Sequence, residues 1–126
     1  MIQGIHHVSL KCADPAAYER AKRFYIDVLG LRLYREWDAG CMLASDSGRI
    51  EIFHNGPGVT EVGAVRHFAL ACDDVDGAAA AVKAAGYEVF IEPKDVLLPS
   101  SPPIRARIAF CRGPLNEEIE FFDEKG

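Results

Sequence analysis

The chain contains an internal repeat. Residues 65–74, VRHFALACDD, align in frame with residues 5–14, IHHVSLKCAD, and both segments follow the pattern H-x-x-L-x-C-x-D. Each copy is followed by an alanine-rich helical pattern, a glycine and strand-like segments, and ends in an I-E-x-F run at 50–53 or 119–122. A duplicated order of elements restricts the fold to two copies of one module. Each module begins with a histidine and ends with a glutamate.

The length favours one domain built from both copies. A chain of 126 residues can bury one core but is too short for two independent ones. We therefore expect a single domain over 1–126, with module one at about 1–55, a linker at about 56–63 and module two at about 64–126. No segment approaches the ~20 apolar residues of a membrane span, and the N-terminus lacks the features of a secretory signal. We expect no membrane partner and a cytoplasmic location.

Charge and cysteine content exclude two further classes. The net charge is −5, and no cluster of Lys and Arg could neutralise a row of phosphates, which argues against nucleic acid as a partner. The four cysteines are widely spaced and form no C-x-x-C pair. We interpret them as buried small hydrophobic residues rather than as disulfides or a zinc site.

Local patterns predict the order of elements within each module. A strand at 4–12 places His7 on its more polar face, and Asp14 and Asp74 are expected to cap helices that end at Gly30 and Gly86. The long segment 92–103, EPKDVLLPSSPP, has four prolines and is expected to be a surface loop. The remaining strands are predicted at 31–37, 40–44 and 49–54 in module one, and at 87–91, 104–111 and 117–122 in module two.

The repeated histidine and glutamate indicate a metal site. Glu51 and Glu120 each stand between hydrophobic neighbours, in IEIF and IEFF, on strands that otherwise belong in the core. A solvated strand face would explain one such glutamate, but a matching His and Glu in both modules can converge on one divalent ion. Two imidazoles and two carboxylates suit Zn²⁺, Ni²⁺, Co²⁺, Mn²⁺ or Fe²⁺. Two coordination positions would then stay open for water or substrate oxygens.

These residues resemble the vicinal oxygen chelate superfamily, and most closely its glyoxalase I-like members. The resemblance covers nearly the whole chain and includes the F-Y-x-x-V-L-G-L helix end at 24–31 and the R-H-F-A-L segment at 66–70. It implies an α+β fold in which two tandem βαβββ modules form a cupped mixed sheet around a metal, usually in a homodimer. It also implies four metal ligands, which by position are His7, Glu51, His67 and Glu120.

The resemblance further implies a reaction. Glyoxalase I moves a proton between neighbouring carbons of a 2-oxoaldehyde–thiol adduct through a cis-enediolate, with a glutamate ligand as base. Glu120 is the first choice for that base, and Glu51 is its pseudo-symmetric counterpart. Asn55 matches a glutathione-contacting asparagine, whereas Lys11 replaces the usual arginine. The usual D-P-D-G turn is altered to residues 113–116, GPLN, which indicates a divergent branch whose substrate need not be a glutathione adduct.

Other readings of the same residues remain open. Arg105 and Arg107 are two apart on one strand and could bind a substrate carboxylate or phosphate, or form a solvated edge. An epimerase acting beside a thioester carbonyl would use similar chemistry, although such relatives usually carry Gln at the position of Glu51. Thiol transfer to an antibiotic epoxide and ring-cleaving dioxygenation fit the ligand set less well. A non-catalytic binding protein, like the bleomycin-sequestering relatives, is the alternative from another class; such relatives typically lack the ligands.

Overall fold

The computed structural model describes residues 1, 3–56 and 65–125. Its contacts divide the chain into two compact units, Met1–Thr60 and Glu61–Gly126. We call the first unit module one and the second unit module two. Of the predicted linker at 56–63, all but Gly56 lies outside the described residues.

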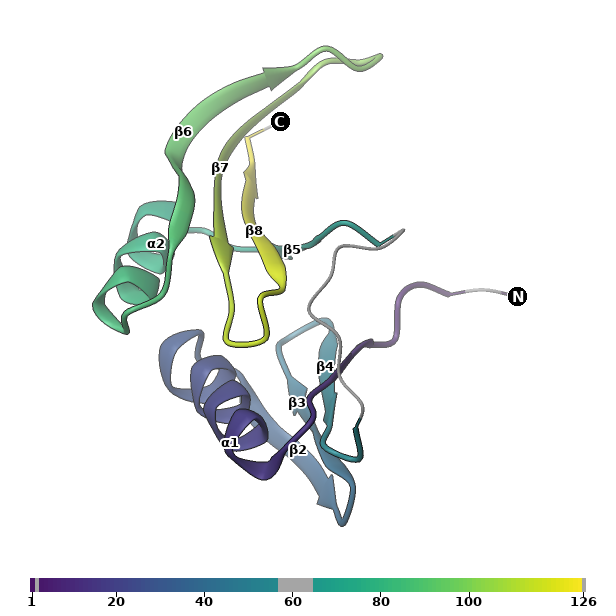
Figure 1. The fold of residues 1–126 in the computed structure, drawn as a ribbon. Helices are drawn as coiled ribbons and strands as arrows, with labels where there is room; N and C mark the ends of the chain where they lie inside the picture. The colour runs from purple at the N-terminus through teal and green to yellow at the C-terminus, as the bar shows by residue number, and fades with distance from the viewer. Residues whose placement is uncertain (2, 57–64, 126) are drawn as a thin grey trace. The chain divides into compact units, whose positions relative to one another are not determined.

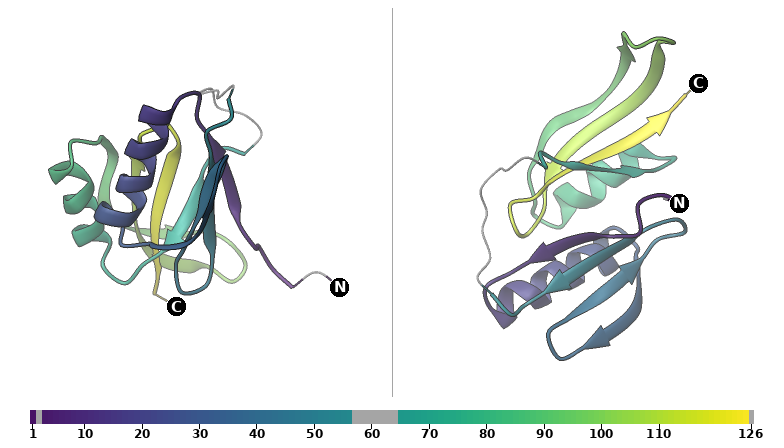
Figure 2. Two further views of the ribbon diagram at one scale, coloured as in Figure 1. Left: turned by 90° about the horizontal axis from the view of Figure 1, so that it is seen from below. Right: turned by 90° about the vertical axis from the view of Figure 1, so that its right-hand side faces the viewer.

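Module one is a four-stranded sheet with a helix on one face (Figures 1 and 2). Its strand order is β1-β4-β3-β2, in which β1 and β4 are parallel and the other neighbours are antiparallel. Its elements are β1 (Val8–Lys11), α1 (Pro15–Arg23), the π-helical turn η1 (Phe24–Val28), β2 (Arg32–Trp37), β3 (Gly40–Ala44) and β4 (Arg49–Phe53).

Module two repeats this topology with the order β5-β8-β7-β6, and again only the first neighbouring pair is parallel. Both modules therefore run strand, helix and three strands, which confirms the predicted α+β fold of two tandem βαβββ modules. The elements of module two are β5 (Phe68–Ala71), α2 (Val75–Ala84), β6 (Val89–Leu98), β7 (Ile104–Arg112) and β8 (Glu118–Glu124).

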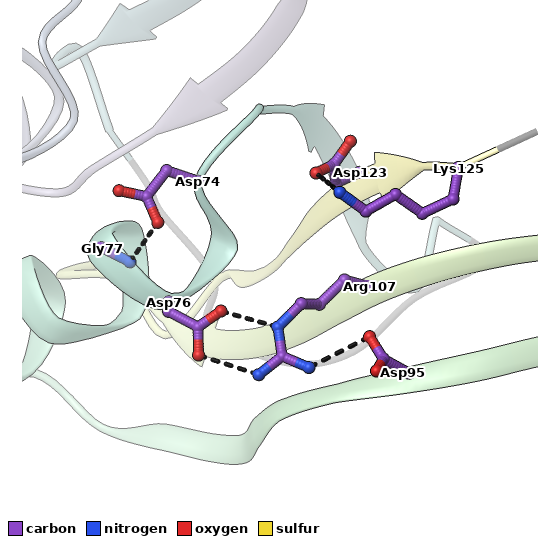
Figure 3. Close-up of polar contacts among 7 residues, drawn as sticks. All are labelled: Asp74, Asp76, Gly77, Asp95, Arg107, Asp123 and Lys125. Atoms are coloured by element: carbon purple, nitrogen blue, oxygen red, sulfur yellow. Dashed lines mark hydrogen bonds and ion pairs between the residues drawn. The ribbon is translucent and has the colours of Figure 1, made fainter.

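Both helices begin at the aspartates that the sequence predicts. The Asp14 carboxylate accepts a hydrogen bond of 2.8 Å from the backbone N–H of Ala17. Asp74 accepts one of 2.9 Å from the N–H of Gly77 (Figure 3). Each bond satisfies an N–H group that has no partner within the helix. No helix in the described ranges is long and apolar enough to cross a membrane.

These caps yield a first prediction about stability. Replacing Asp14 or Asp74 by Ala is expected to lower the free energy of unfolding by about 1 kcal/mol, because each substitution leaves a helix N–H without its acceptor. Urea denaturation of each variant measures the change. Asp73, which is exposed and precedes the cap, provides the control, and an Asp73→Ala variant as unstable as Asp74→Ala would contradict the capping role.

Strand alternation separates a buried face from a second face in each sheet. In β4, Ile50 and Ile52 are buried, whereas the residues that alternate with them, 49, 51 and 53, are only partly buried. In β8, Ile119 and Phe121 are buried, and Glu120 between them is buried as well. In module one, Tyr18 of α1 donates a hydrogen bond of 3.0 Å to Glu36 of β2, which holds the helix against the sheet. The four cysteines are free thiols, three of them buried, as expected.

The prediction of a loop at 92–103 is wrong for residues 92–98. Residues 92–98 belong to β6, which pairs with β7 as far as Leu98 opposite Ile104. Proline has no N–H for a strand ladder, and Pro93 lies at a register shift between Ile91 and Lys94 where the regular pairing is interrupted. Only residues 99–103 connect the two strands. The prolines therefore mark an irregular point and a turn rather than a long loop.

Candidate metal-binding site

The histidine and glutamate of module one lie side by side. β1 and β4 are parallel, with Ser9 opposite Glu51. His7 is two residues before Ser9 and directly precedes Val8, the first residue of β1. His7 Nε2 and Glu51 Oε1 are 3.5 Å apart. Glu51 points away from the core because its two strand neighbours occupy the buried face.

Module two repeats this arrangement in the same register. Ala69 of β5 lies opposite Glu120 of β8, and His67 is two residues before Ala69. His67 Nε2 and Glu120 Oε1 are 3.2 Å apart. The structure thus brings His7 to Glu51 and His67 to Glu120.

The register is the same although the modules differ in length. His67 follows His7 by 60 residues, whereas Glu120 follows Glu51 by 69. The additional residues lengthen a hairpin, since β6 and β7 have 10 and 9 residues and β2 and β3 have 6 and 5. A hairpin can lengthen at its turn without changing the pairing at its base. The insertion therefore leaves the His/Glu pair intact.

The donor atoms of each pair fit one metal ion. Imidazole nitrogen and carboxylate oxygen bind Zn²⁺ at about 2.1 Å, so two such ligands on one ion lie about 3.0–3.4 Å apart. The observed separations of 3.5 and 3.2 Å are close to this range. Within the described part of the chain, no group of three or more His, Cys, Asp or Glu is placed to hold a metal. Each module presents one His and one Glu as candidate ligands, a pair that we call a half-site.

The two half-sites differ in their surroundings. Glu120 is the one buried charged residue of the described core, at 9% exposure. This burial raises the pKa of the Glu120 carboxyl, and the neighbouring His67 opposes the rise. Phe110 lies opposite Glu120 on β7, and its ring packs edge-on against His67 at 5.1 Å. Met42 occupies the matching place opposite Glu51. The residue opposite the glutamate is thus aromatic in module two and aliphatic in module one, whereas the two glutamate side chains are exposed to nearly the same extent, 12% and 14%.

His6 and His7 lie side by side, although the alternation of a regular strand would place them on opposite faces. His6 Nδ1 lies 3.0 Å from His7 Nδ1, and His6 Nε2 lies 3.3 Å from Arg49 Nη1. Both histidines precede Val8, the first residue of β1, so strand alternation does not separate their side chains. His6 can therefore orient the imidazole of His7, as outer partners of metal-binding histidines commonly do. The adjacent histidines were the only sequence signal for this contact.

The two substrate-binding residues predicted in module one lie near its half-site. Lys11 is the last residue of β1 and lies opposite Phe53, two residues along the strands from the pair of Ser9 and Glu51. Lys11 is exposed and lies on the face of the sheet that carries Ser9 and Glu51. Asn55 is exposed and follows the end of β4 closely.

The two arginines predicted to bind substrate lie on the other face of module two. Phe110 shares a face with Glu120, so Arg105 and Arg107, at odd positions of β7, face the opposite way. Arg107 donates two hydrogen bonds to Asp76, of 2.6 and 2.8 Å, and one of 3.0 Å to Asp95 (Figure 3). These bonds hold the pKa of the Asp76 carboxyl below its usual value. Arg107 therefore joins α2 to β6 and β7, away from the His/Glu pair.

Comparison with known families agrees with this architecture. Residues 4–101 match the model of the Glyoxalase/Bleomycin resistance protein/Dioxygenase superfamily, and the chain belongs to that superfamily. No curated protein sequence matches the chain.

Solved structures share the fold over nearly the whole chain. An antibiotic binding protein, TnmS3 from Streptomyces sp. CB03234, is 20% identical with a TM-score of 0.75, and the match covers 98% of each chain. Lactoylglutathione lyase from Agrobacterium tumefaciens is 19% identical with a TM-score of 0.70, covering 98% of this chain and 95% of that one. A glyoxalase/bleomycin resistance protein/dioxygenase from Alicyclobacillus acidocaldarius is 19% identical with a TM-score of 0.72, covering 98% and 92%. At such identities the likeness establishes the fold alone.

Proposed function

We propose that this protein is a divalent-metal-dependent lyase or isomerase of the glyoxalase I type. Its substrate would be small and would carry two neighbouring oxygens, as a 2-oxoaldehyde–thiol adduct does. The observation that carries the proposal is the His/Glu pair found in the same register in both modules. The proposed ligands of one Zn, Ni, Co, Mn or Fe ion are His7, Glu51, His67 and Glu120, supplied by one chain or by two chains of a homodimer.

The glutamates would carry out the proton transfer. A divalent ion held there would act as a Lewis acid and stabilise negative charge on the substrate oxygens. The Glu120 carboxylate would take a proton from one carbon, whose C–H electron pair would form the enediolate, and would return that proton to the neighbouring carbon. Burial makes Glu120 the more suitable base, because its raised pKa strengthens its attraction for a proton. Glu51 is its pseudo-symmetric counterpart in module one.

Lys11 and Asn55 are the proposed contacts to the rest of the substrate. Both are exposed, and Lys11 lies on the face of the sheet that carries Glu51. A lysine ammonium binds a carboxylate as a point charge, without the two-pronged geometry of arginine. This difference favours an adduct other than that of glutathione.

A non-catalytic binding protein is the second candidate. The likeness to an antibiotic binding protein with a TM-score of 0.75 supports it, since the same fold serves antibiotic binding in that protein. The complete set of four candidate ligands, two histidines and two glutamates, favours the enzyme.

Metal analysis of protein purified without chelator tests the proposal. We expect about one Zn, Ni, Co, Mn or Fe per chain, because the two half-sites together provide the four ligands that such ions accept. Elemental analysis gives the stoichiometry, and 2-oxoaldehyde–thiol adducts and acyl thioesters are the first substrates to assay. Two ions per chain would indicate independent half-sites. Failure to bind any of these ions, even on titration, would favour the binding protein.

A further inference from the structure

The face of module one that carries Glu51 has an ordered pattern of side chains across its strands. Arg35, Met42 and Glu51 lie opposite one another on β2, β3 and β4 and form one row. Trp37, Gly40 and Phe53 form the next row. Strands are spaced about 4.8 Å apart, so the backbone of Arg35 lies about 10 Å from that of Glu51. Arg35 therefore lies within reach of a small molecule that also contacts Glu51.

The second row is an aromatic surface. A side chain at Gly40 would be blocked, since its Cβ would lie 2.2 Å from the carbonyl oxygen of Ile52. Because Gly40 has none, the rings of Trp37 and Phe53 meet across β3 with centroids 5.6 Å apart. Both side chains are partly exposed. They provide an apolar surface beside the row of Arg35 and Glu51.

Arg35 has unused hydrogen-bonding capacity. Its guanidinium carbon lies 4.9 Å from the centre of the Trp37 ring, and the side chain is exposed. Such stacking uses the face of the guanidinium and leaves its in-plane N–H groups available. Among the described residues, no carboxylate forms an ion pair with Arg35; the pairs formed by arginines there involve Arg32, Arg107 and Arg112.

Module two lacks this combination. Ile91 and Lys94 lie opposite Phe110 and Ile108 on β7, in the places that Arg35 and Trp37 occupy in module one. Arg112, on the face of Glu120, already pairs with Glu88 at 3.2 Å and with Glu118 at 3.0 Å. The His/Glu pairs are thus alike in the two modules, whereas the residues beside them differ. Only module one offers a stacked, unneutralised arginine there within the described ranges.

We propose that Arg35, Trp37 and Phe53 form a subsite for the part of the substrate remote from the reacting oxygens. Its ligand is a carboxylate or phosphate joined to an aromatic or apolar body, which packs on the two rings while the anion accepts hydrogen bonds from Arg35. The inference extends the proposed function, on which it rests for the position of the reacting oxygens near Glu51. Binding to this subsite itself requires no metal.

Fluorescence of Trp37, the only tryptophan of the chain, tests the subsite directly. The full chain, as purified and after chelator treatment, is titrated with 4-phenylbutyrate, phenyl phosphate and the neutral 4-phenylbutanamide. We expect saturable changes in emission with the anionic probes in both preparations. Binding of the amide should be at least about tenfold weaker, the effect of a lost charge-assisted hydrogen bond. The stronger anionic probe identifies the preferred group.

Two variants of equal charge complete the experiment. Arg35→Gln is expected to weaken binding of the anionic probes at least about tenfold and to leave binding of the amide unchanged. Arg23→Gln, at the exposed end of α1, removes the same charge and should have no effect. Equal affinities for acid and amide, or equal behaviour of the two variants, would overturn the subsite. Because chelated protein is used, that result is independent of whether metal binds.

Discussion

Replacing Glu120 by Gln is expected to lower kcat by about 10²–10⁴-fold on a substrate of the proposed class. The amide cannot accept the substrate proton, and loss of general-base catalysis typically has an effect of this size. The same substitution removes one metal ligand, so the affinity for the ion should also fall, by more than the about 10- to 100-fold typical of outer-sphere partners. Steady-state kinetics at saturating metal and competition with a chromogenic chelator measure the two effects separately.

The controls for this prediction come from the same face and the same strand. Glu51→Gln should weaken metal binding in the same way, because the His/Glu pairs of the two modules have equivalent positions. Glu124→Gln, at the exposed end of β8, removes an equal charge and should change neither value. If Glu120→Gln retained full activity with bound metal, Glu120 would not be the base. If it retained full metal affinity, the half-site of module two would not be a ligand pair.

Glu120→Gln, which is expected to impair activity and metal binding, is not expected to destabilise the metal-free protein at neutral pH, because Glu120 is buried. Its pKa is raised in the folded state, so its contribution to stability is fully present below the pKa of the unfolded chain. That contribution is lost as the pH rises through the raised pKa of the folded state. At neutral pH the Gln variant should therefore be at least as stable as the wild type without metal. Urea denaturation in the presence of chelator at acidic and neutral pH provides the comparison.

Replacing Phe121 by Ala is expected to lower the free energy of unfolding by about 3–5 kcal/mol. Phe121 is 2% exposed, and its truncation leaves a cavity in the core of module two. The loss is a large share of the about 5–15 kcal/mol typical of a whole domain. Leu97→Ala, at a position on β6 that is 62% exposed, should cost much less. Equal losses in the two variants would contradict the assignment of Phe121 to the core.

The same variant tests whether the chain is one domain. A module of about 60 residues is marginal on its own, so we propose that the two modules unfold together. Trp37 lies in module one, whereas Phe121 lies in module two. Phe121→Ala should therefore shift the transition seen by Trp37 fluorescence as much as the one seen by circular dichroism. A Trp37 transition that keeps its wild-type midpoint would mean that the modules unfold independently.

Much of the fold follows from local sequence signals. Asp14 and Asp74 were identified as helix caps because a carboxylate before a helix has few other roles at that place. Asn116, the last residue of the altered turn at 113–116, has a φ of 64°, the left-handed conformation that asparagine tolerates better than most residues. A strand is predicted at 87–91, whereas β6 runs from Val89 to Leu98, because prolines oppose strand formation locally and only the pairing with β7 overrides them.

The sequence by itself determined the duplicated module, the order of its elements and the four residues proposed as metal ligands. The tertiary structure decided which of them meet, since the parallel registers of β1 with β4 and of β5 with β8 join segments more than 40 residues apart. It also placed Arg107 with Asp76, turned His6 toward His7 and aligned Arg35 with Glu51. Such contacts depend on strand register, which is set by long-range pairing and packing of a whole face. A pattern of neighbouring residues does not contain that information.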